Sequence, residues 1–183
     1  MNHLQQQTDE ELMVLIQTHN HEAFSVLVVR HSDRFYALAY RTLFNKTDAE
    51  DMVQEAFLKL WHKPTLWQHK RGSIFTTWFY RLVVNACYDL NKKKLSQESS
   101  LTDQDYDVAV AEGDDSEHKE FVIEEALKEL PERQRTALNL CFYEGLSNKE
   151  AAKVMDINLK ALQSLVMRAK TTLKTRFNIA EEN

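Results

Sequence analysis

The residues with the most suggestive chemistry lie between positions 160 and 176, where five lysines and arginines occur without one acidic residue. Cationic side chains neutralise nucleic-acid phosphates, and polar side chains beside them can read base edges in the major groove. Helical spacing turns one side of this stretch outward, and that side carries Lys160, Ser164, Met167, Arg168 and Thr171. These residue types therefore favour DNA binding and the reading of base edges.

Two short helices joined by a tight turn would position this basic side. Ser147, with Glu150 three residues later, has the spacing of a capping box that starts the first helix. Residues 156–158, Asp-Ile-Asn, break that helix and can cap the next one. Apolar residues recur opposite the basic side of the second helix: Leu159, Leu162, Val166, Ala169 and Leu173. Residues 146–177 thus favour a helix-turn-helix, although a plain helical hairpin with a solvated basic face would show the same pattern.

A second basic stretch runs from residue 59 to residue 94 and holds eight basic residues, interleaved aromatics and a single acid, Asp89. It predicts a loop over residues 62–75 that leaves Trp67 stranded, and then a helix over residues 76–94. The outer side of that helix is predicted to show Thr77, Tyr80, Arg81, Asn85 and Tyr88. Rings beside cations suit unpaired bases and phosphates. Lysines that match the helix dipole, together with ordinary core aromatics, explain the pattern equally well.

The N-terminal part of the chain is predicted to form three further helices. Thr8 with Glu11 makes a capping box for a short packing helix, and a long helix follows over about residues 22–44. Residues 47–50, Thr-Asp-Ala-Glu, make another box that starts a helix with a regular apolar stripe. The opposite side of that helix carries Asp51, Gln54 and Glu55, which spacing alone assigns to solvent.

Composition predicts an all-α protein, because 183 residues include only three Gly and two Pro among long periodic segments. No apolar run is long enough to span a membrane, and the polar N-terminus has no signal-peptide character, so we expect a cytoplasmic protein without membrane insertion. Cys87 and Cys141 are expected to be buried thiols rather than a disulfide or a ligand pair. The histidines lack the converging partners of a metal site.

Charge divides the chain into three parts. Residues 1–94 carry 12 basic and 10 acidic groups, residues 95–118 carry no basic and 8 acidic groups, and residues 119–183 carry 11 and 10. The middle part has low hydrophobicity, which is typical of a flexible tether. We therefore predict two small helical domains, 1–94 and 119–183, joined by a flexible acidic linker over 95–118, with the helix-turn-helix in the second domain.

Three segments in this order, DAEDMVQEAFLKLW, FTTWFYRLVVNACYDLNKKK and LPERQRTALNLCFYEGLSNKEAAKVMDI, resemble the extracytoplasmic-function (ECF) sigma factors of bacterial RNA polymerase. The resemblance implies that the first domain binds core polymerase, with Asp51, Gln54 and Glu55 on the clamp of the largest subunit. It also implies that the following loop and helix open and read the minus-ten element. The residues this assigns to minus-ten DNA are Lys70, Arg71, Trp78, Tyr80, Arg81, Asn85, Lys92, Lys93 and Lys94.

The resemblance further implies that the second domain reads the minus-thirty-five element. Its recognition helix departs from the commonest family form, Thr-Val-Lys/Arg-Ser-Arg, because residues 161–165 read Ala-Leu-Gln-Ser-Leu and lack two basic positions. The usual element sequence therefore does not carry over. The candidate reading residues are Lys160, Gln163, Ser164, Met167, Arg168 and Lys170.

These expectations describe a promoter-specificity subunit without catalytic residues, cofactor or metal, whose partners are core RNA polymerase, promoter DNA and an anti-sigma factor. Two rival functions come from other classes. A dimeric helix-turn-helix regulator that binds only duplex DNA would leave the first domain without a role. A helical enzyme would use four carboxylates of one capped turn as metal ligands, but it would lack a histidine or a second acidic cluster to complete the site. Those carboxylates are Asp48, Glu50, Asp51 and Glu55.

Overall fold

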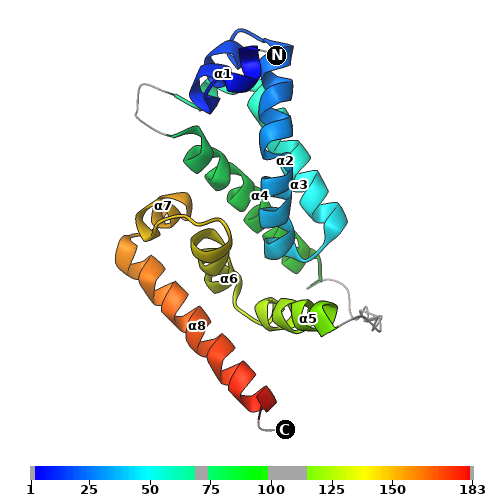
Figure 1. Cartoon of the computed structure of the whole chain (residues 1–183), viewed down its shortest axis with the longest axis vertical. Helices are drawn as coiled ribbons and strands as arrows, with labels where there is room; N and C mark the ends of the chain where they lie inside the picture. Colours follow the sequence, from blue (N-terminus) through cyan, green and yellow to red (C-terminus); the bar gives the residue numbers. More distant parts are fainter. Residues whose placement is uncertain (1–2, 69–73, 99–114, 182–183) are drawn as a thin grey trace.

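The computed structural model of the chain describes residues 3–68, 74–98 and 115–181. Every regular element in these ranges is a helix, which confirms the all-α prediction (Figure 1). The first group, in chain order, is η1 (His3–Gln6), α1 (Asp9–Ile16), α2 (His21–Leu43), α3 (Lys46–His62), η2 (Pro64–Leu66) and α4 (Phe75–Glu98). The second group is α5 (Asp115–Lys128), α6 (Glu132–Leu138), η4 (Asn139–Tyr143), α7 (Asn148–Val154) and α8 (Leu159–Glu181).

Helices α2, α3 and α4 enclose an aromatic core. The Phe79 ring on α4 lies 4.6 Å from the Phe35 ring of α2 and 4.8 Å from the Phe57 ring of α3, measured between ring centroids. Each aromatic side chain buried in this way contributes roughly 1.5 to 3 kcal/mol of transfer free energy. α1 packs across one end of the bundle with Leu12, Met13 and Ile16 buried (Figure 1). The core thereby fixes α4 against its two long neighbours.

The structure confirms the capping boxes predicted at Thr8 and Ser147. The Thr8 hydroxyl accepts from the Glu11 amide at 3.2 Å, and the Glu11 carboxylate accepts from the Thr8 amide at 2.8 Å. Ser147 and Glu150 make the same reciprocal pair at 3.3 and 2.9 Å. Each box satisfies two amides that a helix start leaves without a partner.

The box predicted at Thr47 is wrong, because α3 begins two residues earlier than predicted. Asn45 caps it by accepting from the Asp48 amide at 3.0 Å. The cause lies just upstream: α2 ends at Leu43, and the next residue, Phe44, adopts the left-handed conformation with φ of 51°. That reversal leaves Asn45 as the first extended residue, and Asn is a favoured cap there.

The predicted helix-turn-helix is confirmed as α7 and α8. Asp156 takes a positive φ of 54° in the turn between them, and the Asn158 side chain accepts from the Ala161 amide at 2.8 Å. One side of each helix is buried, through Ala151 and Val154 on α7 and through Leu162 and Ala169 on α8. The turn and the packing are therefore those of a positioned helix pair.

Two other sequence predictions need correction. Trp67 is not stranded in a loop: its ring is buried and lies edge-on to the Phe75 ring at 6.4 Å. The predicted linker, 95–118, has helical ends, because α4 continues to Glu98 and α5 begins at Asp115. Residues 99–114, the centre of that linker, lie outside the described residues.

The two groups of helices contact each other at the end of α2. The Arg135 guanidinium on α6 donates to the Thr42 carbonyl at 2.7 Å, and the Asn139 amide donates to the Arg41 carbonyl at 3.2 Å. The last four carbonyls of a helix have no partner within it. Side chains of the second group therefore cap α2 from outside.

Candidate nucleic-acid and protein interfaces

The three α3 residues assigned to polymerase, Asp51, Gln54 and Glu55, are exposed on one side of that helix. The opposite side is buried in the bundle, through Ala49, Val53, Ala56, Phe57 and Leu60. One face of α3 therefore packs in the core, and the opposite face presents polar side chains to solvent. The exposed position is confirmed, and the polymerase contact stays a prediction.

Tyr80 is not on an outer face as predicted, because its side chain is 0% exposed. Its ring packs edge-on against the Phe35 ring at 4.9 Å, and its hydroxyl donates to the Glu144 carboxylate at 2.7 Å. Burial, followed by the hydrogen bond to Glu144, raises the pKa of Tyr80 well above its ordinary value. The physical reason for the error is that α4 is covered on two sides, by its own bundle and by the second group of helices.

Glu144 lies at the end of η4, just before Gly145, and joins the two groups. Its side chain is only 4% exposed and accepts from Arg34 at 3.0 Å and from Arg41 at 3.2 Å, in addition to Tyr80. A buried carboxylate needs such partners, since desolvation without them costs several kcal/mol. Sequence reasoning missed Glu144 because its partners come from positions about 60 to 110 residues away, beyond any local pattern.

Arg81 and Trp78 face the second group across a cleft. The Arg81 guanidinium pairs with the Asp156 carboxylate at 3.0 Å, although the two side chains are 45% and 76% exposed. An ion pair this open to water contributes little stability. The cleft, of about 680 Å³, is lined by Thr77, Trp78 and Arg81 from α4 and by residues of α7 and its turn. Trp78 itself is half-buried.

Asn85 lies apart from this cleft, in a groove between α3 and α4. The groove is lined by Glu55 and Lys59 from α3 and by Asn85 and Lys93 from α4, among others. One residue assigned to polymerase thus shares a groove with two assigned to minus-ten DNA. The structure divides the predicted minus-ten residues between two places.

The lysine cluster at the end of α4 is mostly open. Lys92 and Lys93 are exposed, whereas Lys94 pairs with the Asp48 carboxylate at the start of α3. Lys70 and Arg71 lie outside the described residues. Two cations of the cluster are therefore open to solvent, and their contact with DNA stays a prediction.

All six candidate reading residues of α8 are exposed: Lys160, Gln163, Ser164, Met167, Arg168 and Lys170. They lie on the side away from Leu162 and Ala169, which are fully buried. The Lys170 ammonium also lies 4.4 Å from the centre of the Phe142 ring, a cation–π contact at the edge of this side. An exposed cationic helix after a tight turn has the geometry needed to enter a major groove.

Within the described ranges, no three His, Cys, Asp or Glu side chains converge as metal ligands would. None of the helices in that part of the chain is both long and apolar enough to span a bilayer.

The chain matches two family models, described as Sigma-70 region 2 over residues 27–96 and as Sigma-70, region 4 over residues 120–173. It is 28% identical over 185 residues to the RNA polymerase sigma-H factor of Pseudomonas aeruginosa, covering 93% of this chain and 94% of that protein. It is also 28% identical to the ECF RNA polymerase sigma-E factor of Escherichia coli K12, covering 94% and 95%.

A solved structure has the same fold. The sigma factor RpoE of Bartonella quintana, in complex with the anti-sigma factor NepR, has a TM-score of 0.68 at 22% identity, covering 85% of this chain and 97% of that one. The matched regions are the two groups of helices that carry the α3 face and the helix-turn-helix. The chain belongs to the sigma-70 family of RNA polymerase sigma factors and, within it, to the ECF class.

Proposed function

We propose that this sigma factor, which directs RNA polymerase to promoters, does so in the cytoplasm by binding core polymerase through the exposed α3 face and promoter DNA through α4 and α8. The observation that carries the proposal is the placement of Asp51, Gln54 and Glu55 on the free side of a helix whose other side is core. The core does not use that side of α3, so it is free to meet a partner, and membership of the sigma factor family points to core polymerase as that partner.

Promoter opening is assigned to α4 and its flanks. Arg81 and Asn85 are exposed, Trp78 is half-buried, and Lys92 and Lys93 can meet phosphates. Affinity for the unpaired strand offsets the few kcal/mol needed to unstack bases. Tyr80 is buried, so we assign it to packing in the form described here. The chain contributes binding and positioning, and the polymerase contributes the chemistry.

Reading of the minus-thirty-five element is assigned to the exposed side of α8. Gln163 can pair with the edge of adenine and Arg168 with that of guanine, each worth about 1 to 3 kcal/mol of discrimination. An anti-sigma factor is proposed as a further partner, because the structurally similar RpoE was solved with one. A dimeric regulator of duplex DNA is the rival, and it predicts no affinity for core polymerase.

The test is binding to core polymerase by Asp51→Ala with Gln54→Ala. We expect at least a ten-fold loss of affinity, which equals about 1.4 kcal/mol, with an unchanged unfolding temperature. The matched control makes the same two substitutions at Asp103 and Gln104, in the acidic linker, and should bind normally. Run-off transcription with wild-type chain should accompany the binding. Equal affinity of the two variants would refute the α3 assignment, and no affinity of the wild type would favour the rival.

A further inference from the structure

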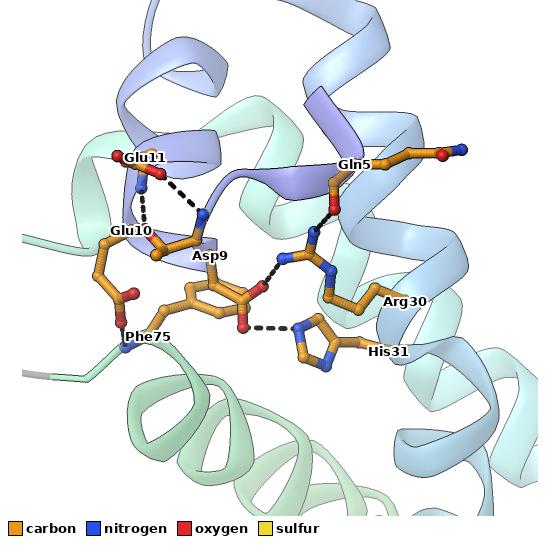
Figure 2. Close-up of polar contacts among 8 residues, drawn as sticks. Gln5, Asp9, Glu10, Glu11, Arg30, His31 and Phe75 are labelled. Atoms are coloured by element: carbon orange, nitrogen blue, oxygen red, sulfur yellow. Dashed lines mark hydrogen bonds and ion pairs between the residues drawn. The ribbon is translucent and has the colours of Figure 1, made fainter. Parts of the chain in front are cut away.

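α1, which lies before the matched family regions, makes polar contacts with α2 and with the start of α4 (Figure 2). From its sequence it is expected only to pack. Asp9 reaches α2 and Glu10 reaches the start of α4, while Gln17, the residue that ends α1, reaches the connection after α3. Packing needs none of these three contacts, so they call for a separate explanation.

Glu10 caps α4 from a different helix. Its carboxylate accepts from the amide of Phe75, the first residue of α4, at 3.1 Å (Figure 2). The preceding residue is Ile74, whose side chain has no atom that could accept from the first amides of the helix. A carboxylate at this end also interacts favourably with the helix dipole. α1 therefore supplies a cap that the Ile74 side chain cannot provide.

Gln17 holds the other end of the α3–α4 connection. Its side-chain amide donates to the Trp67 carbonyl at 3.2 Å and to the Pro64 carbonyl at 3.4 Å. Trp67 is buried against the Phe75 ring. The residue bound by Gln17 therefore packs on the residue bound by Glu10. A single short helix thus contacts both ends of the connection that leads into α4.

α1 is itself firmly anchored. Leu12, Met13 and Ile16 are fully buried, and the Asp9 carboxylate pairs with Arg30 at 2.6 Å and with the His31 ring at 2.8 Å (Figure 2). Burial alone would raise the pKa of Asp9, but hydrogen bonds from His31 and Arg30 more than offset it and hold the pKa below its ordinary value. Asp9 is therefore ionised at neutral pH, and α1 is tied to α2.

We propose that α1 positions the promoter-facing start of α4, with Glu10 and Gln17 as the positioning residues. The inference rests on the proposed function, because it assigns the consequence to Trp78 and Arg81, in the first two turns of α4. A displaced first turn would misplace Trp78 for an unpaired base while leaving the α3 face intact. The loss should therefore appear in promoter opening and not in polymerase binding.

The experiment compares three variants with the wild type. The first is the double variant Glu10→Ala/Gln17→Ala, and the second is Glu10→Gln. The third is a control, Glu22→Ala, at an exposed site in the first turn of α2. Two quantities are measured below the unfolding temperature of every variant. The first is hydrogen exchange at the Phe75 amide, by NMR. The second is promoter opening with saturating core polymerase, on duplex DNA and on DNA mismatched across the minus-ten element.

For the double variant we expect hydrogen exchange at the Phe75 amide to be about ten-fold faster. Opening of duplex promoters should fall by about ten-fold. Mismatched DNA should recover part of the activity, because it removes the opening step. Glu10→Gln keeps an acceptor without the charge and should lie between wild type and the double variant, while Glu22→Ala should match wild type in both measurements.

Three results would overturn the inference. Unchanged exchange at Phe75 would show that α1 does not hold the start of α4. Faster exchange with normal opening would show that this hold does not position promoter contacts. An equal loss on duplex and mismatched DNA would assign the defect to general folding. If the wild type opens no promoter, the proposed function fails instead, and exchange at Phe75 still reports whether α1 caps α4.

Discussion

The candidate DNA-facing sides of α8 and α4 differ in how much of each is covered. Every candidate on α8 is exposed, whereas on α4 Tyr80 is buried, Arg81 pairs with Asp156 and Lys94 pairs with Asp48. The difference follows from the neighbours. α8 packs along one side on α6 and α7, and α4 lies between its own bundle and α7 (Figure 1).

Helical periodicity reports one buried side of a helix and no more. On α8 the single buried side is the periodic one, so the remaining residues face solvent as predicted. On α4 a second contact surface buries a tyrosine that the pattern placed outside. Glu144 is the centre of this second contact, with partners on α2 and α4. Substitutions at this contact should therefore destabilise the protein far more than substitutions on the exposed side of α8.

The largest effect is expected from Glu144→Gln. The substitution leaves two arginines and a tyrosine around a neutral side chain, and we expect the free energy of unfolding to fall by about 2 to 4 kcal/mol. The matched control is Asp156→Asn, which removes the exposed carboxylate that pairs with Arg81 and should cost less than about 0.5 kcal/mol. Urea unfolding measures both. Similar losses in the two variants would mean that Glu144 has no special role in joining the groups.

A smaller effect is expected from Tyr80→Phe, which keeps the ring and removes only the hydroxyl. No cavity forms, so the loss is that of one hydrogen bond to a charged acceptor, about 1 to 3 kcal/mol. Combined with Glu144→Gln it should cost less than it does alone, because Gln keeps an acceptor for the Tyr80 hydroxyl but not the charge that strengthens this hydrogen bond. A double-mutant cycle by urea unfolding provides the measurement. Full additivity would contradict the pairing of Tyr80 with Glu144.

The smallest effect on stability is expected on α8. Gln163→Ala with Arg168→Ala should leave the unfolding temperature unchanged, since both side chains are exposed. It should weaken specific promoter binding by about 1 to 3 kcal/mol per base contact and spare nonspecific binding more. Titrations of holoenzyme on specific and unrelated duplexes would measure this. A loss of stability comparable to that of Tyr80→Phe would remove the contrast between α8 and α4.

Local chemistry made much of the fold predictable. The capping boxes at Thr8 and Ser147 each act within three residues, and the turn before Asn158 uses residues suited to it. The α3 face was predictable as exposed because one apolar stripe decides it. Polymerase and promoter roles came from resemblance, since a solvated face and a binding face have the same spacing.

Contacts between distant segments were beyond sequence reasoning. Glu144 meets Arg34 and Tyr80, and Glu10 meets the Phe75 amide, across separations of 64 to 110 residues. The cap predicted at Thr47 was wrong for a related reason, because the left-handed residue Phe44 after α2 makes Asn45 the cap of α3. Periodicity carries no information about such partners.

We propose that this chain and core RNA polymerase together open a promoter, using exposed residues of α4. Permanganate footprinting of unpaired thymines across the minus-ten element tests it directly, with wild type and with Arg81→Ala/Asn85→Ala on duplex and mismatched templates. With the wild type, reactive thymines are expected on both templates. With the variant, thymine reactivity is expected to fall strongly on duplex DNA and to recover in part on mismatched DNA. Undiminished opening of the duplex by the variant, or no opening by wild type with bound polymerase on a cognate promoter, would contradict it.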